Sequence, residues 1–124
     1  APFSGVVQDV QYKKGKFLAA FNHDASDENE QSLIYIKSNL GIFKVKQIAG
    51  LIARRIFCYL KINKEIKIGE KIGFIMFGSR VDIIIKENID LNIKMGQKVI
   101  GGETIIGKLN EDQISKSKKR EKKV

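Results

Sequence analysis

The chain has 124 residues, of which 43% are hydrophobic, and this is enough for one small domain with a core. Its formal net charge of +9 favours acidic partners, either a nucleic acid or an anionic membrane surface, although the heavy shared use of Lys and Ile weakens that argument. No apolar run reaches the roughly 18 residues that a membrane span needs, and no signal peptide is visible. We therefore expect a soluble or peripheral protein, in which the single cysteine, Cys58, is a buried apolar residue in a reducing compartment.

Short apolar runs separated by turn residues predict a mainly β chain with little helix. Residues 4–12 alternate as a strand, and residues 13–16 are predicted to form its turn. Residues 22–31 are polar and acidic, which predicts a solvated loop with one helical turn. Their spacing does not match a calcium-binding loop, so no metal site is predicted. The runs 32–37 and 41–47 are joined by a short Asn- and Gly-containing segment and predict a β-hairpin.

An apolar segment at residues 48–53 ends at Arg54 and Arg55. Two guanidinium groups beside an apolar wall can hold a phosphate or a carboxylate, but they can equally be an ordinary surface pair. Adjacent residues of a strand face opposite sides, so we expect one of the two arginines to point into any site.

A weak internal repeat relates residues 65–73 to residues 98–106, since each has an apolar residue, a short gap, Gly-Glu and a further strand. Paired units of this kind predict short strands and tight turns, as in barrel-sandwich folds. The expected fold is a small barrel-sandwich-like β domain over residues 1–109. The remainder, residues 110–124, has six basic residues and one acidic residue from Ser115 onward and predicts a disordered basic C-terminal tail.

The step Gly78–Ser79 interrupts two strand-like apolar runs. A glycine there can mark a kink or bulge between two core strands. It can also mark a strained turn in which a serine attacks the carbonyl of the residue before it, because glycine adopts conformations that other residues avoid. The resulting ester can eliminate, which cuts the chain and leaves a pyruvoyl group in place of Ser79.

The sequence Met-Phe-Gly-Ser-Arg-Val-Asp at residues 76–82 resembles the processing site of the phosphatidylserine decarboxylases, which depend on a pyruvoyl group. Further blocks are similar to that family in the same order, up to Gly107. They lie at residues 15–17, 25–30, 47–56 and 96–104.

This resemblance implies self-cleavage between Gly78 and Ser79, which would give a β chain of residues 1–78 and an α chain of residues 79–124. The pyruvoyl group derived from Ser79 would form a Schiff base with phosphatidylserine, and loss of CO2 would give phosphatidylethanolamine. Arg54 or Arg55 would then meet the lipid phosphate.

The same resemblance implies that Phe77 helps to exclude water from the substrate. It also implies a zymogen that works as a peripheral enzyme at the cytoplasmic face of the cell membrane, with an anionic membrane surface as its partner. In the resembled family, the segment before the position of Ala1 carries a His-containing motif that supplies the base for cleavage. We therefore expect this chain to be the carboxyl-terminal part of such an enzyme, with a missing amino-terminal segment as partner and poor self-cleavage on its own.

The chain departs from the family pattern within the polar loop. His23 and Asp24 stand where an Asp-Lys pair is typical, and Gln31 stands where an Arg is typical. The alternatives to the decarboxylase hypothesis are an inactive or partner-dependent β-rich fragment, and a small basic nucleic-acid-binding domain. The second lacks clustered aromatic residues on one strand face, so no nucleic-acid partner is expected.

Overall fold

The computed structural model describes residues 1–39, 41–51, 55–75, 78–86 and 89–109. By their contacts the residues form two compact units, Ala1–Ile84 and Ile85–Val124. The tail at residues 110–124 lies outside the described residues. Its disorder and the domain boundary after residue 109 therefore remain predictions.

Strands dominate the described part of the chain, and the predicted fold class is confirmed as mainly β, with short strands, tight turns and little helix. No helix in that part has the length and apolar character needed to cross a bilayer. The elements are β1 (Gly5–Lys13), α1 (Ala25–Glu28), β2 (Gln31–Ser38), β3 (Gly41–Ile48), β4 (Ile56–Cys58), β5 (Glu65–Ile66), β6 (Gly73–Ile75), β7 (Arg80–Ile85), β8 (Ile89–Leu91) and β9 (Gly107–Leu109).

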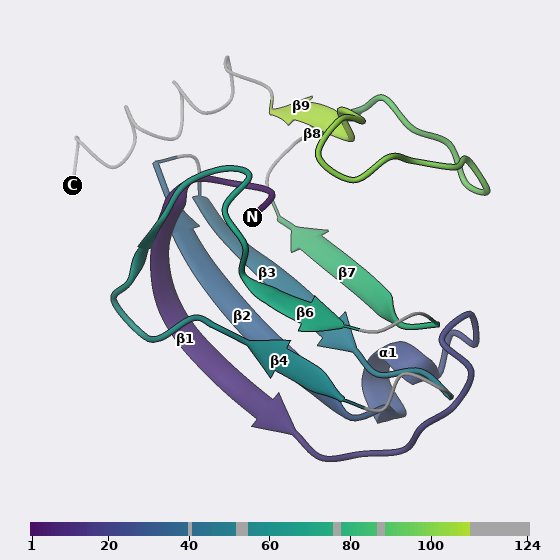
Figure 1. The fold of residues 1–124 in the computed structure, drawn as a ribbon. Helices are drawn as coiled ribbons and strands as arrows, with labels where there is room; N and C mark the ends of the chain where they lie inside the picture. The colour runs from purple at the N-terminus through teal and green to yellow at the C-terminus, as the bar shows by residue number, and fades with distance from the viewer. Residues whose placement is uncertain (40, 52–54, 76–77, 87–88, 110–124) are drawn as a thin grey trace. The chain divides into compact units, whose positions relative to one another are not determined.

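The first unit is built on a five-stranded sheet with the order β5-β1-β2-β3-β7 (Figure 1). The predicted hairpin is confirmed, because β2 and β3 pair antiparallel up to Ser38 and Gly41. The predicted turn at residues 13–16 does not close a hairpin. Instead β1 reaches Lys13 and the chain passes through α1 before its partner β2 begins at Gln31. The connection thereby carries the polar loop to the end of the sheet next to β7.

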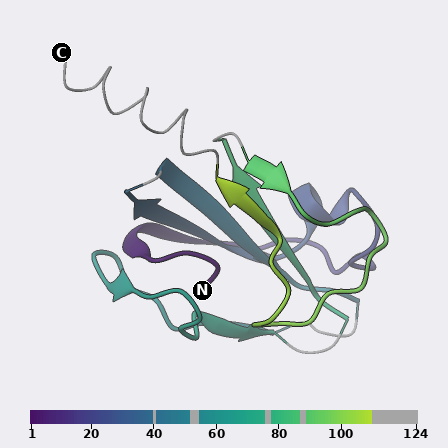
Figure 2. The same ribbon diagram turned by 90° about the horizontal axis from the view of Figure 1, so that it is seen from above.

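The antiparallel pair β4–β6 lies on one face of this sheet (Figure 2). Alternation along the strands places apolar side chains on that face, because successive residues of a strand point to opposite sides. Cys58 is half-buried and packs against this core, as expected for an apolar role. The buried core cluster consists of Val7, Ile34, Ile36, Val45, Leu60 and Ile66.

Four turns in the described residues share one geometry, in which the third residue has a positive φ and the fourth N–H donates to the first carbonyl oxygen. This conformation favours Gly or Asn at the third position. Two of these turns are the Gly-Glu sites of the predicted repeat, so the tight turns expected from the repeat are confirmed. The four turns span residues 61–64, 67–70, 94–97 and 100–103, with Asn63 at φ 71°, Gly69 at 85°, Gly96 at 82° and Gly102 at 78°.

The core makes a direct prediction about stability. Ile36 is fully buried, whereas Ile42 on the neighbouring strand is 46% exposed. Ile36→Ala is expected to lower the free energy of unfolding by about 2–5 kcal/mol, because it leaves a cavity as well as removing buried apolar surface. The matched change Ile42→Ala should cost about 1 kcal/mol or less. Urea unfolding followed by circular dichroism measures both, and equal losses would contradict the assignment of the core face.

Candidate active site

Gly78 and Ser79 form the turn that leads directly into β7. Gly78 is exposed with a φ of +85°, in the left-handed region where a side chain is strained, and Ser79 is half-buried. The step therefore separates two strands, as both interpretations of the sequence required. A positive φ is a conformation that glycine adopts readily and that other residues avoid, as the self-cleavage hypothesis expected for Gly78.

The carbonyl group of Gly78 lies against the backbone of Gly50. A Cβ placed on Gly50 would lie 1.9 Å from the carbonyl oxygen of Gly78 and 2.9 Å from its carbonyl carbon. The methyl group of Ala20 would be 3.5 Å away from the same point. The carbonyl that precedes Ser79 thus occupies the space where any other residue at position 50 would carry its side chain.

Beyond Ser79, Arg80 and Asp82 hold the start of β7. Both point to the same side of the strand because they are two residues apart. The Arg80 guanidinium donates from Nε to Oδ1 of Asp82 at 2.6 Å and from Nη2 to Oδ2 at 3.2 Å. Its Nη1 also donates to the backbone oxygens of Ala20 and Asn22, both at 3.4 Å. The residue that follows Ser79 is thereby attached to the polar loop.

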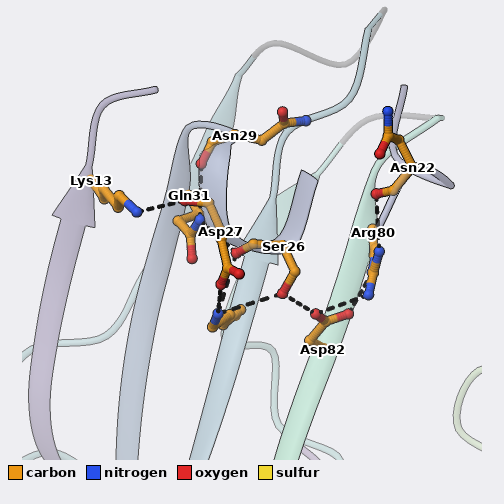
Figure 3. A network of polar contacts seen from close by, with 9 residues as sticks. Lys13, Asn22, Ser26, Asp27, Asn29, Gln31, Arg80 and Asp82 are labelled. Atoms are coloured by element: carbon orange, nitrogen blue, oxygen red, sulfur yellow. Dashed lines mark hydrogen bonds and ion pairs between the residues drawn. The ribbon is translucent and has the colours of Figure 1, made fainter. Parts of the chain in front are cut away.

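Asp82 connects this fork to α1 and β3 (Figure 3). The hydroxyl of Ser26 donates to Oδ2 of Asp82 at 2.6 Å. Lys46, whose side chain is 10% exposed, donates to the Ser26 backbone oxygen at 3.2 Å and to its hydroxyl at 3.4 Å. It also forms an ion pair with Asp27 at 3.7 Å. Alternating cations and anions therefore run from β7 across α1 to β3.

Burial by itself raises the pKa of Asp82, but the hydrogen bonds from Ser26 and Arg80 and the positive charges of Arg80 and Lys46 outweigh it. The net effect is that the pKa of this carboxyl group lies below its ordinary value. Asp82 is consequently an anion at neutral pH, with its charge directed at the two cations.

Asn29 fixes the segments on either side of the Gly78 carbonyl. Its side chain is fully buried. The Leu18 N–H donates to Oδ1 at 3.0 Å, and Nδ2 donates to the backbone oxygens of Leu18 at 2.8 Å and Ala49 at 2.7 Å. One amide therefore ties together two irregular segments, one leading to Ala20 and the other to Gly50.

Of the site residues that the sequence predicted, Gly78 and Ser79 lie together in this site. Arg55 is exposed and lies immediately before β4. Arg54 and Phe77 lie outside the described residues, and their roles stay predictions.

The polar loop behaves as expected in its secondary structure, since α1 is a single helical turn, and it lies beside Arg80 and Asp82. Gln31, which replaces a typical Arg, is buried and donates to the backbone oxygens of Ser26 and Asn29, each at 2.9 Å. The positive charge near the Ser26 carbonyl comes from Lys46 instead.

Sequence reasoning missed Gly50, Asn29, Ser26, Lys46 and the Arg80–Asp82 fork as site residues. The Arg80–Asp82 pair could have been found from the sequence, because two charged residues at positions i and i+2 of an apolar strand share one face. Ser26 and Asn29 stood in a block already singled out. Gly50 likewise stood in the block at residues 47–56, but its contact with Gly78 depends on tertiary packing. Lys46 had no local signal, since its place in the site depends on strand register.

The comparisons with known proteins concern the sequence that forms this site. The family model described as phosphatidylserine decarboxylase matches residues 1–107 of the chain. The chain belongs to the phosphatidylserine decarboxylase family. Its membership rests on a match that includes every described residue of the candidate site.

The relatives of this family member include proenzymes from bacteria and archaea. A phosphatidylserine decarboxylase proenzyme from the Wolbachia of Brugia malayi is 47% identical over 112 residues, which are 90% of this chain and 49% of the relative. One from Geotalea uraniireducens is 45% identical over 107 residues, 86% of this chain and 50% of the relative. A putative archaetidylserine decarboxylase proenzyme from Methanococcoides burtonii is 45% identical over 115 residues, which are 93% of this chain and 55% of the relative. The chain spans about half the length of the curated relatives it matches, and no solved structure matches it.

The first prediction from the site concerns Asn29. Asn29→Ala should lower the free energy of unfolding by about 2–3 kcal/mol, because part-buried backbone groups of Leu18 and the buried carbonyl of Ala49 lose their partners. The matched change Asn22→Ala, at an exposed residue whose side chain accepts one hydrogen bond from Asp24, should stay within about 0.5 kcal/mol. Urea unfolding gives both values. Similar losses in the two variants would show that Asn29 does not have this role.

The second prediction concerns pH. Because the pKa of Asp82 is lower in the folded protein than its ordinary value of about 3.9, its ionised form stabilises the fold. That contribution is complete above the unfolded pKa and is lost as the pH falls through the lower folded pKa. The stability difference between the wild type and Asp82→Asn should therefore shrink below about pH 4. Urea titrations across this range provide the measurement, and a difference that is constant with pH would refute the pKa shift.

Proposed function

We propose that the chain carries the self-cleaving segment of a pyruvoyl-dependent carboxy-lyase that converts phosphatidylserine to phosphatidylethanolamine and CO2. The observation that carries this proposal is the Gly78–Ser79 turn. In this turn the half-buried Ser79 follows a glycine with a φ of +85°. The names of the relatives support it, because they are proenzymes of phosphatidylserine or archaetidylserine decarboxylases.

Self-cleavage would proceed through the chain's own atoms. The Ser79 hydroxyl oxygen attacks the Gly78 carbonyl carbon, the bond from that carbon to the Ser79 nitrogen breaks, and the nitrogen takes up the hydroxyl proton to leave an ester and an amine. Loss of the Ser79 Cα proton then breaks the bond between Cβ and the ester oxygen. Gly78 leaves as a carboxylate, and the dehydroalanine left behind tautomerises and is hydrolysed by one water, which releases ammonia.

The residues present fit a pyruvoyl group at position 79. Gly78 has no side chain of its own to block its carbonyl, and Arg80, the residue next to the group, is held by Asp82 and by the backbone of the polar loop. A pyruvoyl group supplies an electrophilic carbonyl that binds the substrate amine and accepts the electrons released when CO2 departs. The protein supplies the fixed position of that group between the ends of β3 and β7.

We further propose that Arg54 or Arg55 meets the lipid phosphate and that Phe77 shields the reacting carbon from water. The exposure of Arg55 supports the first role, because a phosphate can reach its guanidinium group. The proposed location is the cytoplasmic face of the membrane, with anionic lipid as partner. Its support is the net charge of +9 and the cross-strand pair Phe57 and Phe74, which are 47% and 52% exposed.

The proposal is tested by intact mass under denaturing conditions. The chain is incubated alone and with the half of the Wolbachia relative that it does not match, in vesicles that contain phosphatidylserine. We expect the 14.0 kDa species to split after Gly78 when that half is present, with a blocked terminus on residues 79–124 and release of CO2. Splitting that occurs only with the added half would identify a partner-dependent fragment.

Two serine variants complete this test. Ser79→Ala should remain a single species, because the attacking hydroxyl is absent. Ser38→Ala, in the distant β2–β3 hairpin, should split like the wild type. The absence of any split in the wild type, or an unchanged split in Ser79→Ala, would overturn the proposed function.

A further inference from the structure

Gly50 belongs to a different part of the chain from the Gly78–Ser79 bond, yet it lies in direct contact with it. It follows β3 by two residues and is buried. A Cβ there would be 1.9 Å from the carbonyl oxygen of Gly78, whereas real Cβ contacts essentially never fall below 3.0 Å. A side chain at position 50 therefore requires the carbonyl to move by about 1 Å, and such misplacement of a reacting group can cost a factor of about 100 in rate.

The surroundings of Gly50 prevent it from yielding instead. The neighbouring Ala49 accepts a hydrogen bond from Asn29 at 2.7 Å and donates one to the Glu30 backbone oxygen at 3.0 Å. Ile48, Ala49 and Gly50 are all buried. On the far side, Ala20 is held by the Arg80 guanidinium. Gly50 is thus part of a fixed wall, and the adjoining turn is the element that would shift.

We propose that Gly50 is a positioning residue for self-cleavage, an inference that rests on the proposed function. Its bare Cα lets the Gly78 carbonyl pack against the end of β3 and sets the orientation of that carbonyl for attack by Ser79. During the attack the carbonyl oxygen becomes a negatively charged oxygen on a tetrahedral carbon. The space that it needs is the space that a side chain at position 50 would fill.

The test measures ester formation without requiring the pyruvoyl group. The full chain is incubated with hydroxylamine in the presence of the same added half of the Wolbachia relative. Hydroxylamine attacks the ester carbonyl of Gly78 and releases a Gly78 hydroxamate and a fragment that begins with Ser79 and its free amine. Gly50→Ala should reduce the rate of this cleavage by about 100-fold. Gly101→Ala is the matched control, because a Cβ at Gly101 meets nothing within 4 Å and no positive φ constrains it. It should cleave at the wild-type rate.

A second readout separates positioning from a general loss of structure. The carbonyl carbon of Gly78 is labelled with 13C, and its NMR signal is recorded with the amide signals of β1, β2 and β3. In Gly50→Ala we expect the carbonyl signal to move while the strand signals stay in place. If the strand signals are lost, the double variant Ala20→Gly/Gly50→Ala is measured by the same criteria. The Ala20 methyl is the side-chain group nearest to the new Cβ, at 3.5 Å, and its removal lets the backbone around position 50 relax on that side.

The outcomes distinguish this inference from the proposed function. Cleavage of a folded Gly50→Ala chain at the wild-type rate would overturn the positioning role and leave the proposed function standing. If the wild type itself is not cleaved, the proposed function fails for this chain. The NMR signal of the Gly78 carbonyl then tests its contact with Gly50. An unchanged signal overturns the inference, and a shifted signal with intact strands supports the contact.

Discussion

The buried amide of Asn29 is the interaction on which the rest of the site depends. The segments that contain Leu18 and Ala49 are irregular, so their backbone groups lack the partners that a sheet provides. An amide side chain can both accept and donate hydrogen bonds, and Asn29 accepts one from and donates two to these two segments. Because of this link, Ala20 and Gly50 have fixed positions, and the Gly78 carbonyl has a surface to pack against.

The charged network complements that link from the other side of the turn. Burial of Asp82 opposes its ionisation, and the fork from Arg80, the Ser26 hydroxyl and the charge of Lys46 outweigh the penalty. The network fixes the first residue of β7, while Gly50 confines the carbonyl before Ser79. A turn with a positive φ at its glycine is thus held at both ends by groups that do not themselves need to react.

Much of this arrangement could be predicted where the information is local. Two apolar runs joined by Asn and Gly predicted the β2–β3 hairpin, and the Gly-Glu steps predicted two tight turns. The Gly-Ser step, together with the family resemblance of residues 76–82, predicted the candidate site. The course of the chain after Lys13 was not predictable from a turn-like composition, since tertiary pairing sends it through α1. Gly50 and Lys46 were missed for the same reason, because only the register of β3 with its neighbours brings them to the site.

The position of the Gly78–Ser79 bond has a consequence for assembly. A cut there would turn contacts within one chain into a subunit interface, in which β7 remains paired with β3. Arg80 and Asp82 would belong to one subunit, and Ala20, Asn22 and Ser26 to the other. Hydrogen bonds, the attraction between Lys46 and Asp82 and a shared sheet would then hold the two pieces as a heterodimer without a covalent link. The same groups that orient the uncut turn would keep the new amino terminus of the smaller subunit in place.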